Sequence, residues 1–338
     1  MAETETPFVT VVMAVYNSEK TLKRSIESVL NQTYSQWRMI CVNDGSTDSS
    51  LDILNDYALK DKRITVLSKE NGGQTSARAA AFEIATTPYV IMLDSDDCYT
   101  SDLLQSVVEC AIATNADAVA PNLLIEQADG SYMDWNKHNG ISVGSSIGGM
   151  EAFEQTFIGA RMHGVNLWKT SLVKKYAVGS NAMYCKQNAD EYIQRVLFLN
   201  CEKVVFSKGA YIYQNNTNSI SKRFSIMQLG YLETCRRYIT LCTTCHVDKR
   251  IVSICYEYYL RHVIHLQIRL FKDGDALSTE QKKMMTREIK RAWKDAVTHK
   301  DECRFADKRF PWLYKTASTS GYGLFLLSCY FFGKIKSF

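Results

Sequence analysis

The sequence lacks the glycine-rich loops that hold phosphate in many α/β nucleotide-binding proteins. None of its 17 glycines forms G-x-G-x-x-G after the first β-rich run, and G-x-x-x-x-G-K-[ST] occurs nowhere in the chain. The first absence argues against a Rossmann dinucleotide site, and the second argues against a P-loop ATPase. Any phosphate that this protein binds must therefore be held by other groups.

Membrane-spanning, secreted and disulfide-rich classes are also disfavoured. The apolar run at 322–332 is too short to span a bilayer, and the start, MAETETPFVTVV, is polar and acidic, unlike a secretory signal. The eleven cysteines are scattered, and the nearest approach to a metal-ligand cluster, CTTCH at 242–246, has no evident further ligands for zinc. We therefore expect reduced thiols and a cytoplasmic location.

Composition indicates a globular protein with an uneven distribution of charge. With 338 residues, of which 46% are apolar and 22% charged, the chain can form one large domain or two smaller ones. Residues 222–338 hold 22 Lys and Arg against 11 Asp and Glu, a balance of +11, whereas residues 1–221 hold 18 against 25, a balance of −7. This division suggests two regions with different partners.

The first 115 residues alternate between strand-like and helix-like patterns. Short β-rich runs lie at 8–16, 39–42, 64–68 and 89–93, separated by helical stretches near 18–32, 49–60, 74–86 and 101–114. This alternation predicts βαβ units and a mostly parallel sheet flanked by helices. Ligands of such sheets collect at the carboxyl ends of the strands, which is where the polar loops YNSE, NDGSTD, KENGG and DSDD fall.

The pattern loosens into mixed, loop-rich sequence after about residue 117 and becomes helical after about residue 224. Ser278 and Gln281 have the spacing of a capping box at the start of one of these helices. In the tail, aromatic residues beside Lys334 and Lys336 fit an interfacial membrane anchor, and a helix docked on the domain is the other interpretation. The positive balance of this region favours an anionic membrane surface.

Three carboxylates follow directly after a buried apolar run in YVIMLDSDD. Alternation along an extended stretch places Asp94 and Asp96 on the same side, with Asp97 beside them. Carboxylates this close require a cation, and Mg²⁺ or Mn²⁺ prefers a few carboxylates together with phosphate oxygens and water. The simpler alternative is a solvated turn in which Asp97 or Ser101 caps the following helix.

Asp44 and Arg78 are further candidates near predicted strand ends. Asp44 ends a predicted strand in VNDGSTDSS, where its carboxylate can accept a hydrogen bond from a base N–H, or can simply cap a turn. Arg78 lies early in the helix after NGGQTSA, where it can meet a base or a phosphate, or form a surface salt bridge. Neither residue decides the function alone.

Together these segments resemble the nucleotide-binding half of family 2 glycosyltransferases with the GT-A fold. The resemblance lies in VTVVMAVYNSEKTLKRSIESVLNQTY, VNDGSTDSS and NGGQTSARAAAFEIATTPYVIMLDSDD, in this order and spacing, over about residues 7–115. It resumes more weakly at 163–222 through HGVNLWKTSLVKKY, NADEYIQRVLF and YIYQNNTNSIS. It implies a GT-A Rossmann-like catalytic domain at 1–224, with a nucleotide-sugar-binding half at 1–115 and an acceptor-binding half at 116–224, followed by a C-terminal helical region at 225–338.

The resemblance also implies roles for single residues around the donor. Ala14, Tyr16 and Asp44 would line the pocket for the nucleotide base. Arg78 would lie beside that pocket, and Asn71 would border the donor.

The same resemblance assigns the metal site and the catalytic base. Asp94 and Asp96 form the DxD that meets the donor diphosphate through Mn²⁺ or Mg²⁺, and Asp97 adjoins it. The base of the family is the Asp of an ED pair that opens a helix in the second half. Here that residue is Asp190, with Glu191 as the alternate, although Asp190 could instead serve as a helix N-cap.

The implied reaction is an inverting, metal-dependent transfer from a UDP-sugar to a hydroxyl of a glycan or lipid-linked glycan of a bacterial surface polysaccharide. It would take place in the cytoplasm or at the inner face of the membrane, with no nucleic acid as partner. Three departures from the family pattern support a rival hypothesis, a catalytically weak nucleotide-sugar-binding protein on the same fold. These are Ala79 in place of Asn, Ala189 in place of Glu and Gln214 in place of Arg. A fourth departure, Asn43 in place of Asp, is a mild change at a position that need not bind metal.

Overall fold

A computed structural model describes residues 8–157, 162–179, 189–214, 224–299 and 321–335. The contacts divide the chain into two compact units, one of Met1–Tyr184 with Asp190–Thr217 and the other of Cys185–Ala189 with Asn218–Phe338. The expected boundary at residue 224 stays a prediction.

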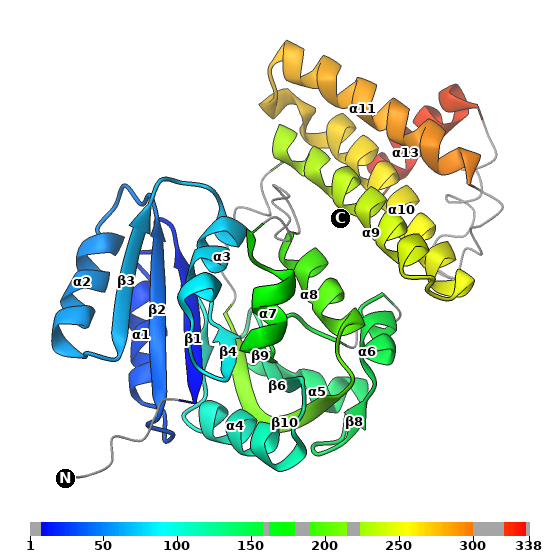
Figure 1. Ribbon diagram of the computed structural model, residues 1–338. Helices are drawn as coiled ribbons and strands as arrows, with labels where there is room; N and C mark the ends of the chain where they lie inside the picture. Colours follow the sequence, from blue (N-terminus) through cyan, green and yellow to red (C-terminus); the bar gives the residue numbers. More distant parts are fainter. Residues whose placement is uncertain (1–7, 158–161, 180–188, 215–223, 300–320, 336–338) are drawn as a thin grey trace, which may run out of the picture. The chain divides into compact units, whose positions relative to one another are not determined.

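Four parallel strands form one side of the sheet in the first unit (Figure 1). They are β1 (Val9–Val15), β2 (Trp37–Asp44), β3 (Ile64–Lys69) and β4 (Tyr89–Met92), in the order β3-β2-β1-β4. All four β-rich runs of the sequence therefore form strands. Their side chains are mostly buried, as expected of a sheet covered by helices.

Helices connect these strands at the predicted places. They are α1 (Leu22–Leu30), α2 (Ser50–Lys60), α3 (Gln74–Ile84) and α4 (Leu103–Thr114). On α1 the spacing of Leu22, Ile26 and Val29 puts all three side chains on one face, and all three are buried in the core. Helix α4 ends at Asn115, whose left-handed φ of +50° stops the helix.

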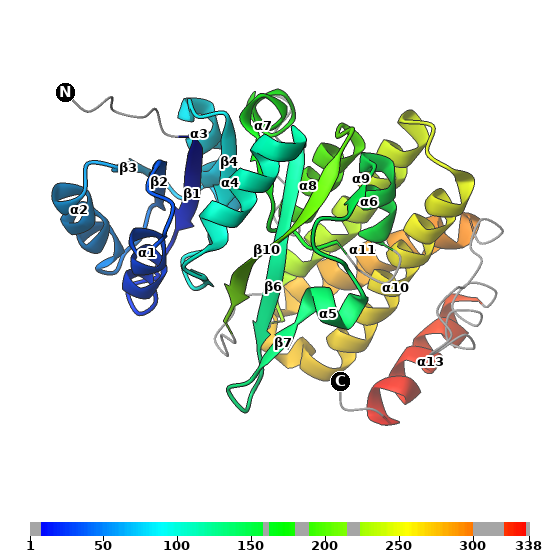
Figure 2. The same cartoon turned by 90° about the horizontal axis from the view of Figure 1, so that it is seen from below.

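The second half of the first unit adds short and antiparallel strands. They are β5 (Cys98–Tyr99), β6 (Ala118–Glu126), β7 (Tyr132–Asp134), β8 (Ser146–Ile147), β9 (Leu167–Lys169) and β10 (Val204–Tyr213). The order continues as β4-β9-β6-β10-β5, and β9 runs antiparallel to both of its neighbours. The ten-stranded sheet is therefore mixed, although its long pairs, such as β6 with β10 (Figure 2), are parallel.

Short helices complete this half of the unit. They are α5 (Trp135–Asn139), α6 (Gly149–Gln155), α7 (Thr170–Tyr176) and α8 (Ala189–Leu199). Trp168 on β9 packs against Phe198 on α8, with 4.9 Å between the ring centroids, and both side chains are fully buried. This contact fixes α8 on the sheet and so sets the position of the residues at the start of α8.

The described part of the second unit is helical, as predicted. It contains η3 (Ile226–Leu229), α9 (Gly230–Thr244), α10 (Lys249–Asp273), η4 (Gly274–Ala276), α11 (Thr279–Thr298) and α13 (Tyr322–Ile335). Helix α10 contacts α9, α11 and α13, and the predicted capping box of Ser278 and Gln281 starts α11. Within the described ranges, none of the helices combines the length and the apolar character needed to cross a bilayer.

His163, in the segment before β9, is held as a neutral imidazole. Its Nε2 lies 2.9 Å from the carbonyl oxygen of Pro121, and its Nδ1 accepts a hydrogen bond of 3.3 Å from the backbone N–H of Val165. Burial lowers the pKa of His163 from 6.5 to about 4, although the contact with the Pro121 carbonyl oxygen acts in the opposite direction. Protonation of this ring therefore opposes folding.

The fold should lose stability through His163 when the pH falls below about 6.5. The unfolded chain then binds a proton that the folded protein does not, so the contribution of His163 to the free energy of unfolding should fall by about 2 kcal/mol between pH 7 and pH 5. Urea denaturation at the two pH values measures this fall as the difference between the wild type and His163→Gln. His163→Gln should remove it, whereas His138→Gln at an exposed site on α5 should keep it, and the same pH dependence in both variants would refute the assignment.

Candidate functional site

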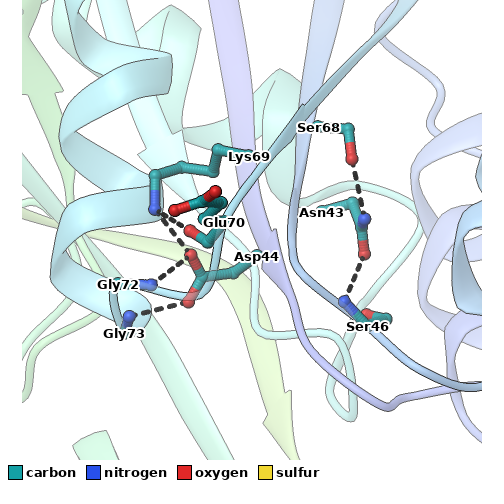
Figure 3. A network of polar contacts seen from close by, with 8 residues as sticks. All are labelled: Asn43, Asp44, Ser46, Ser68, Lys69, Glu70, Gly72 and Gly73. Carbon is teal, nitrogen blue, oxygen red and sulfur yellow. Dashed lines mark hydrogen bonds and ion pairs between the residues drawn. The ribbon is translucent and has the colours of Figure 1, made fainter.

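Asp44, the last residue of β2, organises the loop that follows β3 (Figure 3). Its Oδ1 accepts hydrogen bonds from Lys69 Nζ at 2.8 Å and from the backbone N–H of Gly72 at 2.9 Å. Its Oδ2 accepts one from the N–H of Gly73 at 2.7 Å. Because Asp44 is only 2% exposed, this carboxylate depends on these three donors for its stability.

Two glycines allow the loops after β2 and β3 to approach each other. Gly73 has a φ of +87° and precedes α3, so its N–H can point at the Asp44 carboxylate. Gly45 has a φ of +74°, and a Cβ there would lie 2.9 Å from the backbone N of Asn71. The structure thereby brings Asp44 and Asn71, two residues that are predicted to contact the sugar-nucleotide donor, to the same strand end.

Asn43 has a structural reason for being an amide rather than a carboxylate. Its Nδ2 donates to the Ser68 hydroxyl at 2.9 Å, and its Oδ1 accepts from the N–H of Ser46 at 3.2 Å (Figure 3). A carboxylate at this buried position could accept a hydrogen bond from Ser46 and from the Ser68 hydroxyl, but it could not donate one to either residue. This departure from the family pattern is therefore part of the β2–β3 contact.

The DSDD turn after β4 is attached to the start of α1. The carbonyl oxygen of Ser95 accepts from Thr21 Oγ1 at 2.8 Å and from Ser25 Oγ at 3.0 Å. Arg24 Nη2 donates to the carbonyl oxygen of Asp96 at 3.0 Å. The backbone of the turn is thus fixed by side chains of one helix, which leaves the carboxylates of the turn to other partners.

Arg78 is the cation that lies among the predicted carboxylates. Its Nη2 is 2.5 Å from Asp94 Oδ1, and the same oxygen accepts from Gln74 Nε2 at 3.2 Å. Arg78 is 8% exposed. Burial alone would lower the pKa of its guanidinium, but the carboxylates of Asp94 and Asp190 raise it above its usual value. Arg78 is therefore a permanent positive charge that two carboxylates share.

Asp97 connects the same turn to β10. Its Oδ2 accepts from the Tyr211 hydroxyl at 2.7 Å, and its Oδ1 accepts from the backbone N–H of Gln214 at 2.8 Å. The Tyr211 oxygen also accepts from the N–H of Asp94 at 3.2 Å. Burial raises the pKa of Asp97 to about 7, although both hydrogen bonds oppose this rise. These contacts give Asp97 a structural role, and its contact with a donor stays a prediction.

Asp190 and Arg78 line the same pocket, although 112 positions separate them in the chain. Asp190 lies in the first turn of α8, and Arg78 lies on α3. The other lining residues come from α3, β4, β9 and α8, and they are Thr75, Phe82, Met92, Trp168, Ile193, Gln194 and Leu197. Mostly apolar walls therefore surround two opposite charges.

Glu191, the alternate base, has a structural partner of its own. Its Oε2 accepts from Arg195 Nη1 at 3.0 Å, one helical turn away. Arg195 is buried, donates from Nε to Thr156 Oγ1 at 2.9 Å, and lies 4.1 Å from the ring centroid of Phe157. Since Glu191 is held by this cluster and is not among the pocket residues, the geometry favours Asp190 as the reactive carboxylate.

Ala14 and Tyr16 lie at the end of β1, next to β2. Ala14 pairs with Val42 in the sheet and is partly exposed, and Tyr16 is exposed just beyond the strand. They therefore lie at the same sheet edge as Asp44. Their contact with a nucleotide base stays a prediction.

That Asp94 and Asp96 hold a divalent cation stays a prediction, and a bound ligand would have to supply further oxygen atoms. The hydrogen bonds that Gln74 and Arg78 donate to Asp94 both reach its Oδ1. The Asp94 side chain is one-third exposed, and Asp96 is also partly exposed. Among the described residues, no group of three or more His, Cys, Asp or Glu is placed to hold a metal ion. Two carboxylates are what Mg²⁺ or Mn²⁺ uses when phosphate oxygens and water supply the remaining ligands.

Residues 10–192, more than half of the chain, match the model of "Glycosyl transferase family 2". The chain belongs to this family. The match includes both the DSDD turn and Asp190, whereas the pocket residues Ile193, Gln194 and Leu197 lie just beyond its end. The GT-A fold expected from the sequence is also confirmed, by the structural comparison that follows.

Several relatives show what this family 2 chain is similar to. It is 28% identical over 229 residues to the glycosyltransferase GlyA of Streptococcus pneumoniae, and this match covers 63% of this chain and 31% of GlyA. It is 40% identical over 100 residues to the poly(ribitol-phosphate) beta-glucosyltransferase of Bacillus spizizenii, and this match covers 28% of this chain and 16% of that relative. The chain thus spans less than a third of the length of either relative.

Residues 1–349 of TarS from S. aureus, solved in complex with UDP-GlcNAc, have a similar structure. The TM-score is 0.72 at 16% identity, and the match covers 97% of this chain and 92% of the other. At this identity the likeness shows the fold alone. It supports an α/β sheet flanked by helices together with a C-terminal helical region.

Lys69 is a site residue that sequence reasoning does not single out. It ends β3 in register with Asp44 at the end of β2, so the two charges meet across neighbouring parallel strands. A strand-end Lys beside a strand-end Asp is a signal that the sequence contains, but it requires the strand order to be known. Lys69 Nζ also donates to the carbonyl oxygen of Glu70 at 2.6 Å, which closes the loop.

Lys69→Met should destabilise the first unit, because the buried Asp44 carboxylate then loses its charged donor. We expect the free energy of unfolding to fall by about 1–3 kcal/mol, measured by urea denaturation. Lys62→Met, which replaces an exposed Lys close by in the chain, is the matched control and should unfold like the wild type. Equal stability of the two variants would show that the Lys69–Asp44 pair contributes little.

Proposed function

We propose that the chain is an inverting, metal-dependent glycosyltransferase that moves a sugar from a UDP-sugar to a hydroxyl of a glycan or lipid-linked glycan in surface polysaccharide synthesis. One observation carries this proposal. Arg78 interacts with both Asp94 of the DxD turn and Asp190 of the second half, and Arg78 and Asp190 line one pocket. A diphosphate site and a candidate base are thus next to each other, as sugar transfer requires.

The nucleotide is assigned to the strand ends of β1, β2 and β3. Tyr16 is exposed and can stack on a base, while Ala14 leaves room for the ring. Asp44 Oδ2 accepts from Gly73 and can take a second donor, which suits the N–H of uracil. Asn71 borders the same edge through its contact with Gly45.

The diphosphate is assigned to the DSDD turn. Asp94 and Asp96 would hold Mn²⁺ or Mg²⁺, which supplies Lewis-acid stabilisation of the negative charge on the leaving group. Arg78 adds a fixed positive charge, because the raised pKa of its guanidinium keeps it protonated. The attachment of the turn to α1 keeps these groups in place before a donor binds.

The transfer itself needs a base and a single displacement. Asp190 takes the proton of the acceptor hydroxyl as that oxygen attacks the anomeric carbon from the face opposite UDP. The bond from the anomeric carbon to the diphosphate oxygen breaks, and its electron pair leaves with UDP. Since one displacement occurs, the configuration at the anomeric carbon inverts.

The relatives support the substrate class. TarS is described in complex with UDP-GlcNAc, and the Bacillus spizizenii relative is a glucosyltransferase that acts on poly(ribitol-phosphate). The TarS complex holds a UDP-sugar, and the name of the second relative gives a polymer as the acceptor, which supports a UDP-sugar donor and a glycan acceptor for this chain. The sugar and the linkage made by this chain are to be found by a donor screen.

The second candidate is a nucleotide-sugar-binding protein with weak catalysis. Its supporting observation is the series of departures from the family pattern, of which Ala189 beside the base is closest to the chemistry. Asn43 does not add support, because its amide is used inside the fold. Gln214 contacts Asp97 through its backbone N–H, which most residues at this position could provide.

Asp190→Asn should abolish turnover and leave donor binding intact. We expect the rate of UDP release from the best UDP-sugar, with Mn²⁺ present, to fall about 10²–10⁴-fold, because general base catalysis is lost. The Kd for UDP, measured by isothermal titration calorimetry, should change by less than about threefold, since Asp190 is not assigned to the nucleotide.

Glu191→Gln is the matched control, one residue away on the same helix. It should keep at least about a third of the wild-type rate, because Glu191 is paired with Arg195 outside the pocket. A large loss in Glu191→Gln with a small one in Asp190→Asn would reverse the assignment of the base. UDP binding by the wild type without UDP release from any donor would favour the second candidate.

A further inference from the structure

Helix α13 has two apolar faces, and only one of them is buried. Phe325, Cys329 and Phe332 belong to the core of the second unit. Phe325 stacks on Trp293 of α11, with 5.8 Å between the ring centroids. This contact and the burial of the three side chains show that α13 is already anchored to the helices beside it. Its other face therefore needs a separate explanation.

The exposed face of α13 carries large apolar side chains at helical spacing. Leu324 is 53% exposed, Leu327 53%, Tyr330 40% and Phe331 59%. Phe271 of α10 is 43% exposed and meets Tyr330 edge to face at 5.6 Å. We call these five residues the α13 patch.

The α13 patch is unusual within the described part of the chain. Fifteen large hydrophobic residues are exposed there, and four of them lie within eight consecutive residues of α13. Single exposed residues such as Leu59 on α2 are ordinary and need no explanation. A continuous group of leucines and aromatics on one helix face is typical of an interaction surface.

Charge indicates what covers the α13 patch. Residues 308–338 contain five Lys and Arg and no Asp or Glu, and residues 222–338 have a balance of +11. Lys334 follows Phe331 by three residues within the same helix. An apolar helix face in a segment whose charged residues are all positive matches a surface that is apolar inside and anionic outside.

We propose that the α13 patch docks on an anionic lipid bilayer, with α13 lying along the interface. Leucine and aromatic side chains would enter the boundary between headgroups and acyl chains, and the lysines would remain among the lipid phosphates. A second copy of the chain is a poorer partner, because a two-fold interface would bring two positively charged segments together. This proposal does not depend on the sugar-transfer reaction.

Vesicle flotation of the full chain tests the docking. The wild type should float with vesicles of phosphatidylcholine and phosphatidylglycerol at low salt and should bind vesicles of phosphatidylcholine alone much more weakly. Leu327→Ser with Phe331→Ser should weaken binding by roughly tenfold or more, because two large apolar side chains no longer enter the bilayer. Leu59→Ser, which removes an exposed leucine from α2 in the first unit, should bind like the wild type.

A second variant separates the charge contribution from the apolar one. Lys334→Gln with Lys336→Gln should weaken binding to the anionic vesicles by roughly tenfold and reduce its salt dependence, because each lysine near the surface adds attraction. These substitutions leave the apolar residues in place. Circular dichroism of each variant checks that the helices are kept, and the lysine variant decides the question if the serine variant loses helicity.

Three outcomes would overturn the proposal. The first is that the wild type does not float with anionic vesicles at low salt. The second is that the serine variant is folded and floats as well as the wild type. The third is that sedimentation shows a dimer of the wild type that the serine variant, and no other variant, loses. The last result, with no lipid binding, would identify a second copy as the partner. UDP release by the wild type is measured in the same preparations, so a failure of docking is distinguished from a failure of the proposed reaction.

Discussion

The ion pair between Arg78 and Asp94 is the interaction on which the rest of the site depends. Several carboxylates gather at the end of β4 and the start of α8, and they can remain ionised together only if a positive charge lies among them. Arg78 supplies that charge from α3. The beginning of α3 is in turn held by the hydrogen bond from Gly73 to Asp44. The buried Asp44 thus helps to place the cation that Asp94 and Asp190 share.

This arrangement also accounts for residues that depart from the family pattern. Asn43 donates to Ser68 within the β2–β3 contact, and Ala79 is buried on α3, where a longer amide would need room and a partner. These two changes belong to the packing beneath the site. Ala189 remains the departure closest to the chemistry, since it precedes Asp190.

Much of the first half of the fold follows from sequence patterns. The apolar runs that form β1, β2 and β4 are buried on both faces, so they are continuous and easy to recognise, and the amphipathic spacing of α1 identifies its core face. The strands of the second half are harder to predict from the sequence, for a physical reason. Strand β9 has only three residues, and the pairing of β10 with β6 shifts register between Phe206 and Ala210, which breaks the alternation.

The site shows the same division. Asp94 and Asp96 can be found from a cluster of carboxylates after an apolar strand, because that pattern has its own physical cause. Asp190 cannot be found in this way, since an acidic residue at the start of a helix is common, and its assignment came from the family resemblance. Lys69 was missed because a lysine in a loop suggests a solvated side chain until its neighbour across the sheet is known.

Arg78 and the DxD turn are proposed to form one metal-dependent diphosphate site. Calorimetric titration of UDP with and without Mn²⁺ tests this directly, for the wild type, Arg78→Met and the exposed control Arg38→Met on β2. UDP binding should require Mn²⁺, Arg78→Met should weaken it by roughly tenfold or more, and Arg38→Met should match the wild type. Equal affinity for UDP with and without Mn²⁺, unchanged in Arg78→Met, would show that these residues do not form such a site.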